Sequence, residues 1–460
     1  MKRHLFPVVA WAMAAGVALF LAARAEAVCV GPCCTAHCPV IHTWPTDPPP
    51  CDSTHTLQKC IDSAAAGDTV EIATNGPISE SLTIQASLTL RAADGFAPEF
   101  TTDSGISFIT LDLGDESIDI EGLLHLGSIF IEDAQSKLTA RIVGNSFKPS
   151  SLSPSPIRLL QFYAAGPCTF ELSSNTIDVP DGRDGMDLEQ VEDAWTGRIA
   201  DNKIIMEGSG HAIAIKREYA SMGSTNTGSM SVDVIGNQIS GISFDGGITI
   251  DQNAGTNTER ILDNLVIGQS GNGSPVGAVG LAASGGTVTA TVANNTLVAG
   301  KYGIAASSSA SGSIGGLVAN NIVSGNSLLG MDIDPSVLAT VSNRNNLVFG
   351  NYADYFAPGP GTVTADPLFV DAPYGDYHLK PGSPAIDAGD DSAVPATDLL
   401  GNPITDLDGN PRIQGAHVDI GAYETAPEPD AQMLAVTAIA ALLGVVAREA
   451  ARLRGRRAAA

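Results

Sequence analysis

Short apolar runs separated by turns fill the middle of the chain, and an asparagine recurs at one kind of turn. The run VANNTLVAG begins at Val292, and VANNIVSGN begins 26 residues later at Val318. Such regular recurrence is typical of repeat proteins, in which each repeat buries its apolar side against the next. Aligning similar segments gives asparagines 25 to 35 residues apart, namely Asn145, Asn175, Asn202, Asn237, Asn264, Asn295, Asn321 and Asn346.

A second pattern follows most of these asparagines by about ten residues. The segments GMDLEQ, AIAIKR, GITIDQ, GLAASG, GIAASS and GMDIDP repeat with a period of two. This period predicts a strand whose alternate side chains share one face. The superposition gives two inward columns, which are Met186, Ile213, Ile248, Leu281, Ile304 and Met331, and then Leu188, Ile215, Ile250, Ala283, Ala306 and Ile333.

Stacking of the coils determines what the asparagines do. Equivalent residues of neighbouring coils would lie about 4.8 Å apart, a spacing that suits hydrogen bonds between side-chain amides. Insertions such as GQSGNGSPV, which begins at Gly268, would then fall in turns and leave the strands in place. We therefore predict an inward structural ladder of Asn175, Asn202, Asn237, Asn264, Asn295, Asn321 and Asn346.

Coils of this length, with several strands each, resemble the right-handed parallel β-helix proteins of the pectate-lyase-like superfamily. The segment TLQKCIDSAAAGDTVEIATNGPISESLTIQASLTLRA, from Thr56, resembles the way such proteins begin: a short amphipathic helix, Gly-Asp, and then strands. The resemblance implies an all-β fold, a right-handed parallel β-helix solenoid over residues 56–356. A short helix over Thr56–Ala65 would cap its open apolar end.

The two ends of the chain have the pattern of sorting signals. A basic start, an apolar stretch and Ala25-Glu26-Ala27 predict a signal peptide over residues 1–27, cleaved after Ala27. Residues 427–460 begin with Pro427, Glu428 and Pro429, continue with an apolar stretch and end in arginines, which resembles the PEP-CTERM sorting signal. The resemblance implies transient membrane anchoring and removal of the tail by an exosortase-like protease. A permanent transmembrane anchor is the alternative.

Residues 357–426 resemble the choice-of-anchor Q domain, which follows such solenoids in exported bacterial proteins. The matching pieces are Asp366-Pro367-Leu368-Phe369, Asp376-Tyr377-His378-Leu379, Pro384-Ala385-Ile386-Asp387 and Asp419-Ile420-Gly421-Ala422-Tyr423-Glu424. Together with the two ends, this resemblance predicts an exported protein of the cell envelope, the cell surface or the extracellular matrix.

Six of the seven cysteines lie near the predicted N-terminus of the mature chain. In an exported protein, an even number of cysteines indicates disulfides, here within a Cys-rich segment over residues 28–55 and the start of the solenoid. Three nearby histidines leave a metal cluster as the alternative, and Cys168 is expected to be buried in a strand. The disulfide candidates are Cys29, Cys33, Cys34, Cys38, Cys51 and Cys60.

Charge narrows the range of partners and cofactors. The formal net charge of −26 makes a nucleic-acid partner improbable, because phosphate backbones require a basic surface. The acidic run DGRDGMDLEQVED lacks the ligand spacing of an EF-hand, and DLDGNPR, from Asp406, begins like a calcium loop without its final Glu. We expect no cofactor, with Ca²⁺ as the one candidate that the acidic surface leaves open.

The outward side of the aligned strand carries the candidate chemistry. Lys216 is expected between Glu189 and Asp251 of adjacent coils, with Asp187 nearby, while His211 is interpreted as a turn residue. Polysaccharide lyases of this fold use a basic residue to abstract a sugar proton, and related hydrolases use carboxylate pairs. A surface ladder of charges explains the same residues more simply.

Two functions therefore stay open at the level of the sequence. The first, which we favour, is a structural or glycan-binding component of the cell surface or matrix, with polysaccharide as its candidate partner. The second is an enzyme, a polysaccharide lyase or glycoside hydrolase acting on acidic polysaccharide, for which Asp187, Glu189, Lys216 and Asp251 would be the substrate-binding candidates.

Overall fold

The computed structural model describes residues 38–426 except 102–103, 111–114, 134–136, 151–153, 162–165, 181, 191–193, 218–227, 242–245, 269–276 and 354–357. The predicted signal peptide, the sorting tail and Cys29, Cys33 and Cys34 lie outside the described residues. No helix among the described residues is long and apolar enough to cross a membrane.

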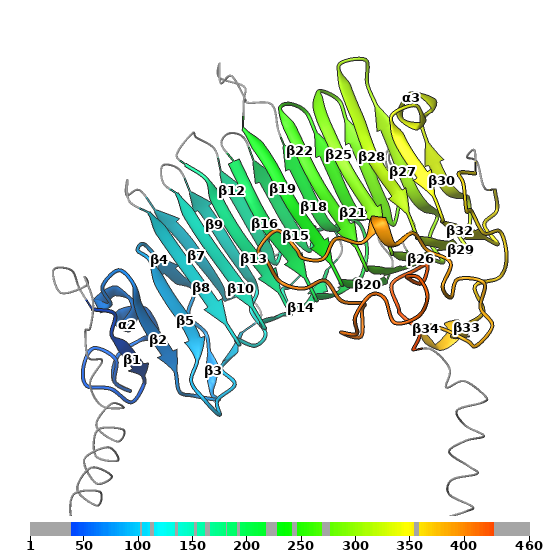
Figure 1. Ribbon diagram of the computed structural model, residues 1–460. Coiled ribbons are helices and arrows are strands. Elements are labelled where there is room, and N and C mark those ends of the chain that lie inside the picture. The colour runs from blue at the N-terminus through cyan, green and yellow to red at the C-terminus, as the bar shows by residue number, and fades with distance from the viewer. Residues whose placement is uncertain are drawn as a thin grey trace, which may run out of the picture.

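Three parallel sheets wind along one axis, so the predicted all-β parallel β-helix is confirmed (Figure 1). Each coil contributes at most one strand to each sheet. The first sheet contains β1 (Ile41–Trp44), β2 (Asp68–Ile72), β5 (Leu88–Ala92), β8 (Glu116–Glu121), β10 (Leu138–Val143), β13 (Cys168–Ser173), β16 (Ala194–Ala200), β19 (Ser229–Ile235), β22 (Thr256–Leu262), β25 (Gly286–Ala293), β28 (Gly312–Ala319) and β31 (Val341–Arg344).

The other two sheets complete the coil. The second sheet contains β11 (Ser146–Phe147), β14 (Thr176–Val179), β17 (Lys203–Met206), β20 (Gln238–Gly241), β23 (Leu265–Ile267), β26 (Thr296–Val298), β29 (Ile322–Ser324) and β32 (Leu347–Phe349). The third sheet contains β4 (Leu82–Ile84), β7 (Gly105–Thr110), β9 (Ser128–Asp133), β12 (Ile157–Gln161), β15 (Met186–Gln190), β18 (His211–Arg217), β21 (Gly246–Gln252), β24 (Val279–Ala283), β27 (Tyr302–Ser308) and β30 (Leu329–Ile333). A short pair, β3 (Pro77–Ile78) and β6 (Glu99–Phe100), lies outside them.

The two inward columns of the third sheet are part of the core. The predicted register of these columns needs one correction. Val279, not Leu281, is the partner of Ile248, and Leu281 is the partner of Ile250. The superposition was wrong by two residues at this coil because the long insertion after Ile267 hides where the strand restarts. A shift of two residues keeps the same face inward, so Leu281 is buried as predicted.

The N-terminal end is closed by α2 (Leu57–Ser63), which begins one residue after its N-cap Thr56. The carboxylate of Glu80 accepts hydrogen bonds from the backbone N–H groups of Leu57 and Gln58, which have no partner within the helix. The apolar side of α2 is buried in the core beside β1 and β2 (Figure 1). Among the candidate cysteines, Cys51 and Cys60 form a disulfide, which joins α2 to the loop before it.

The first strand and the remaining cysteines add to what the sequence indicated. The strand β1 lies inside the predicted Cys-rich segment, yet it pairs in parallel with β2 and so forms the first strand of the first sheet. Cys38 is also disulfide-bonded, and Cys168 is buried in β13. Within the described part of the chain, no three His, Cys, Asp or Glu side chains are grouped to hold a metal ion.

The predicted ladder asparagines lie in one buried line between the first and second sheets. The carboxamide oxygen of each accepts hydrogen bonds from the backbone N–H and the Nδ2 of the asparagine one coil earlier, as Asn264 does for Asn237 at 2.9 Å in both contacts. The residue before each ladder asparagine has a positive φ, which Gly, Asn and Asp adopt most easily. This requirement explains the Asn pairs: the first turns the chain and the second joins the ladder.

Residues 358–426, which we call the strap, run back across the turns between the first and second sheets and cover their outward apolar side chains (orange in Figure 1). Asn294 Nδ2 donates to the Asp419 carbonyl, and Asn320 Nδ2 donates to the Asp390 carbonyl, both at 3.0 Å. The strap contains only β33 (Phe369–Asp371), β34 (Asp376–Leu379) and the short 3-10 helices η2 (Ala372–Tyr374) and η3 (Asp391–Ala393). A short helix, α3 (Pro335–Leu338), precedes the final coil.

Candidate functional site

A network of charged side chains lies on the outward face of the third sheet, across β12, β15 and β18. Lys216 Nζ donates to Asp184 Oδ2 at 2.7 Å and to Asp187 Oδ1 at 3.0 Å. The Lys216 side chain is 30% exposed, and the two carboxylates are 15% and 10% exposed. The ammonium group is therefore held on the outer face of the sheet by two largely buried carboxylates.

A second cation extends the network to the preceding coil. Arg158 of β12 lies with Nε 3.2 Å from Asp187 Oδ2, and its terminal nitrogen donates to Glu189 Oε2 at 3.2 Å. The guanidinium also lies over the Phe130 ring, 5.8 Å from the ring centroid. Asp187 thus bridges Arg158 and Lys216, so that cations and carboxylates alternate across the coils.

The third contributor is His211, the first residue of β18. It lies on the same strand as Lys216 and, like Lys216, contacts Asp184. Its Nδ1 lies 3.0 Å from Asp184 Oδ1, and its backbone N–H donates to the same oxygen at 2.8 Å. Burial disfavours the charged form of Asp184, yet the His211 hydrogen bond and the Lys216 charge outweigh burial and lower its pKa. His211 is thus part of a strand and of the network, and the interpretation as a turn residue was wrong.

The protonation of Lys216 decides what the network can do chemically. Burial favours the neutral amine, but Asp184 and Asp187 together outweigh this effect and raise the Lys216 pKa. A lysine acts as a general base only when its pKa is brought down towards the working pH. At neutral pH, Lys216 is therefore a cation without a lone pair to accept a proton.

The four sequence candidates come together only in part. Glu189, Lys216 and Asp251 are register neighbours on β15, β18 and β21, as the superposition expected. The Lys216 ammonium, however, contacts Asp187 of the expected set and Asp184 outside it, while Glu189 pairs with Arg158. On the far side of Asp251, the neighbour in the register is Ala282 of β24, which carries no charge.

Sequence reasoning missed Asp184 and Arg158. Asp184 belongs to the acidic run DGRDGMDLEQVED, which the sequence analysis compared only with calcium loops. It precedes β15, so it belongs to none of the aligned strand positions. Arg158 belongs to IRLLQ, which aligns with MDLEQ in the structure but lacks the preceding glycine that five of the six aligned segments have. Extending the alignment one coil towards the N-terminus would have placed Arg158 beside Asp187.

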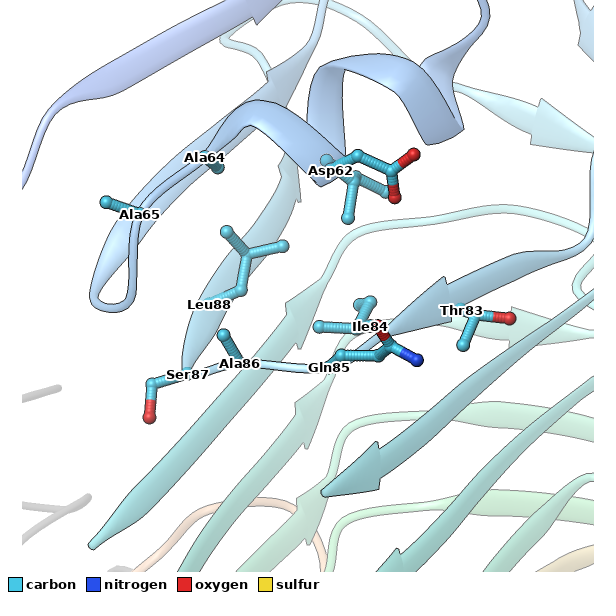
Figure 2. A pocket seen from close by; sticks show the side chains of 10 residues that line it. Asp62, Ala64, Ala65, Thr83, Ile84, Gln85, Ala86, Ser87 and Leu88 are labelled. Carbon is cyan, nitrogen blue, oxygen red and sulfur yellow. The ribbon is translucent and has the colours of Figure 1, made fainter. Parts of the chain in front are cut away.

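A separate cleft of about 360 Å³ lies at the N-terminal end, between α2 and the connection from β4 to β5 (Figure 2). Gln58 fastens the two sides, because its Nε2 donates to the Thr83 carbonyl and its Oε1 accepts from the Thr83 N–H. The one ionisable residue of the lining is Asp62, so the cleft offers no acid–base pair. The lining comprises Ile61, Asp62, Ala64, Ala65, Thr83, Ile84, Gln85, Ala86, Ser87 and Leu88.

Comparison with known proteins adds similarities of fold. No family model matches the chain, and no curated protein matches it. A crystal structure of pectate lyase Pel9A aligns with 85% of this chain and 97% of its own length, at 12% identity and a TM-score of 0.42. The PL6 family alginate lyase AlyGC aligns with 85% of this chain and 60% of its own, at 12% identity and a TM-score of 0.37. The chain is a parallel β-helix, as its strand pairing demonstrates directly.

Proposed function

We propose that this protein is exported, is sorted to the cell surface through its C-terminal tail, and has a structural or glycan-binding role there or in the extracellular matrix. The observation that carries the non-enzymatic half of the proposal is the pairing of Lys216 with Asp184 and Asp187. A protonated lysine paired with two carboxylates removes no proton from a sugar.

Sorting is supported by the pieces that resemble the choice-of-anchor Q domain, which contact one another in the strap. The Ser383 hydroxyl donates to the Pro367 carbonyl at 2.6 Å, and the Asp387 N–H donates to Asp419 Oδ1 at 2.7 Å. Residues distant in the sequence thus form one unit immediately before the predicted tail. Its proposed partner is an exosortase-like protease that recognises Pro427, Glu428 and Pro429.

The alternative, a polysaccharide lyase or glycoside hydrolase, requires groups in other protonation states. A lyase needs an unprotonated base near the sugar, and a hydrolase needs a carboxylic acid whose pKa is raised. In this network the pKa of Lys216 is raised and that of Asp184 is lowered, both against such roles. Acidic polysaccharide is retained in our proposal as a binding partner, with Arg158 and Lys216 as the two cations that this network offers to it.

Incubation of the purified protein with pectate, alginate and related polymers, with and without Ca²⁺, tests this proposal. We expect no unsaturated products and no new reducing ends from the wild type. Retention on immobilised acidic polysaccharide, weakened in Lys216→Met, would support glycan binding, whereas absence of retention would favour the purely structural role. Ca²⁺-dependent turnover that disappears in Lys216→Met would overturn the non-enzymatic proposal.

A further inference from the structure

The strap is joined to the solenoid by a buried cluster of charged groups that the proposed function does not use. Arg412 of the strap lies with Nε 3.3 Å from Oδ1 of Asp263, the residue that turns the chain before Asn264. Its Nη1 lies 3.7 Å from Glu424 Oε2, and its Nη2 donates to the carbonyls of Asp419 and Gly421. The side chains of Arg412, Asp263 and Glu424 are 3%, 2% and 0% exposed.

This cluster holds more potential negative charge than positive charge. Two further buried carboxyl groups lie close to this pair, because the charge of Asp406 acts on Asp263 and that of Asp419 acts on Glu424. Asp406 accepts hydrogen bonds from the backbone N–H groups of Asp408, Asn410 and Glu424, and Asp419 accepts from those of Asp387 and Thr425. Backbone donors of this kind stabilise a carboxylate, and Glu424 has them too, from Asp419 at 3.2 Å and from Gln414. Asp263 has the guanidinium alone among the contacts described.

One guanidinium cannot balance four carboxylates away from water, so some of them take up protons. Burial raises the pKa of Asp263 to about 7, against the opposing charge of Arg412 and with the support of Asp406. Burial likewise raises the pKa of Glu424 to about 8, where Arg412 lowers it and Asp419 raises it. Burial raises the pKa of Asp419 as well. Geometry favours protonation most clearly at Asp263, whose only described partner is Arg412, and the full burial of the Glu424 side chain beside Asp419 favours it there.

We propose that the strap is a pH-sensitive clasp, closed while Asp263 and Glu424 are neutral around Arg412 and loosened when both carboxyl groups ionise. The inference rests on the packing of the strap and not on the proposed function. Its consequence is local, because the strap covers outward apolar side chains of the last coils, among them Leu262, Leu265 and Ile322.

The direction of the effect follows from proton linkage. A carboxyl group whose pKa is higher in the folded state binds its proton more tightly there, so its contribution is fully present below the unfolded pKa. That contribution is lost as the pH rises from the ordinary values of 3.8 and 4.5 towards about 7 for Asp263 and about 8 for Glu424. Above this window the effect is complete and no further loosening is expected.

One histidine of the strap acts in the same direction, and two ion pairs keep the strap joined to the solenoid. His378 lies between Asp376 and Asp408 and against the Tyr423 ring, and these carboxylates outweigh its partial burial and raise its pKa. Its favourable charge is therefore also lost with rising pH, through a folded pKa above 6.5. The pairs Arg198–Asp398 and Arg344–Asp390 continue to connect strap and solenoid, so the clasp loosens without detaching.

Hydrogen exchange of the full chain, followed by mass spectrometry from pH 5 to pH 8.5, tests the clasp. Protection factors, corrected for the intrinsic pH dependence of exchange, are compared between peptides of residues 398–426 and peptides of β19 and β22. The test variants are Asp263→Asn and Glu424→Gln, which remove ionisation and preserve shape. Asn294, Asn320 and Asn345 occupy the position of Asp263 in later coils, so the chain already accepts Asn at this turn. The matched control is Asp201→Asn, the same turn position in an earlier coil, where the side chain is exposed.

In the wild type we expect strap protection to fall with rising pH by up to about tenfold per pH unit for each carboxyl group, while β19 and β22 stay unchanged. The double variant should show a flat profile, and Asp201→Asn should retain the wild-type slope. Wild-type strap protection that does not change with pH, or an unaltered slope in the double variant, would overturn the clasp. Should the double variant fail to fold, the wild-type profile alone still decides.

Discussion

Replacing a single ladder asparagine should destabilise the solenoid far more than replacing its exposed neighbour. The most informative pair is Asn237→Leu and Gln238→Leu, two consecutive residues of which the first is buried and the second exposed. Leucine is close to asparagine in shape, so that the loss of hydrogen bonds is separated from a change in size.

The magnitude follows from the bonds that Asn237 makes. Its Nδ2 donates to Asn264 Oδ1 and to the Ile199 carbonyl, each at 2.9 Å, and its Oδ1 accepts from Asn202 N at 3.1 Å and Asn202 Nδ2 at 2.9 Å. Asn202 Nδ2 keeps the Leu172 carbonyl as a partner, but the Asn202 backbone N–H is left without an acceptor. A buried orphan donor costs about 1–3 kcal/mol and each of the other three lost hydrogen bonds about 1 kcal/mol. Burial of the leucine side chain offsets about 2 kcal/mol of this, so we expect a net loss of about 2–4 kcal/mol.

Urea unfolding followed by circular dichroism measures this difference, provided that both variants keep the wild-type m-value. Gln238→Leu should remain within about 0.5 kcal/mol of the wild type, as surface substitutions usually do. Equal stability of the two variants would refute the ladder as a stabilising element, and it would mean that water or repacking satisfies the Asn202 N–H.

Three further predictions concern the ends and the charged face. Deletion of residues 427–460 should release the exported protein into the medium without a change in its unfolding temperature, and a truncated protein retained on cells would contradict sorting by the tail. Lys216→Ala should fold with nearly the wild-type melting temperature, because partly exposed ion pairs contribute little, and a large drop would show that the network organises the sheet. Removal of the Cys51–Cys60 disulfide by a double Cys→Ala substitution should cost about 2–3 kcal/mol, given the short loop that it closes. Calorimetry of this variant and the wild type, both under oxidising conditions, measures that cost, and equal unfolding temperatures would contradict it.

The repeat pattern was sufficient to predict the architecture because every coil meets the same local conditions. An inward side chain needs an apolar residue at every second position, and the turn before each ladder position needs a residue that accepts a positive φ. Both conditions act within a few residues of the chain, so they appear directly in segments such as VANNTLVAG. The helix over residues 56–65 was readable for the same reason, and α2 begins and ends within two residues of it.

Packing between distant segments determined the placement of the strap, the partners of Lys216 and the burial of Asp263. The local pattern did not indicate that the strap packs along the coils, where it covers outward apolar side chains such as Ile235, Leu262 and Ala293. The partners of Lys216 could not be read from the columns, since Asp184 lies outside the strand and reaches the ammonium group only through the local path of the chain. Burial is the main cause that raises the pKa of Asp263, which lies against Arg412, about 150 residues later in the sequence. The sequence by itself therefore determined the coil, whereas only the tertiary structure decided which charges face each other and which are removed from water.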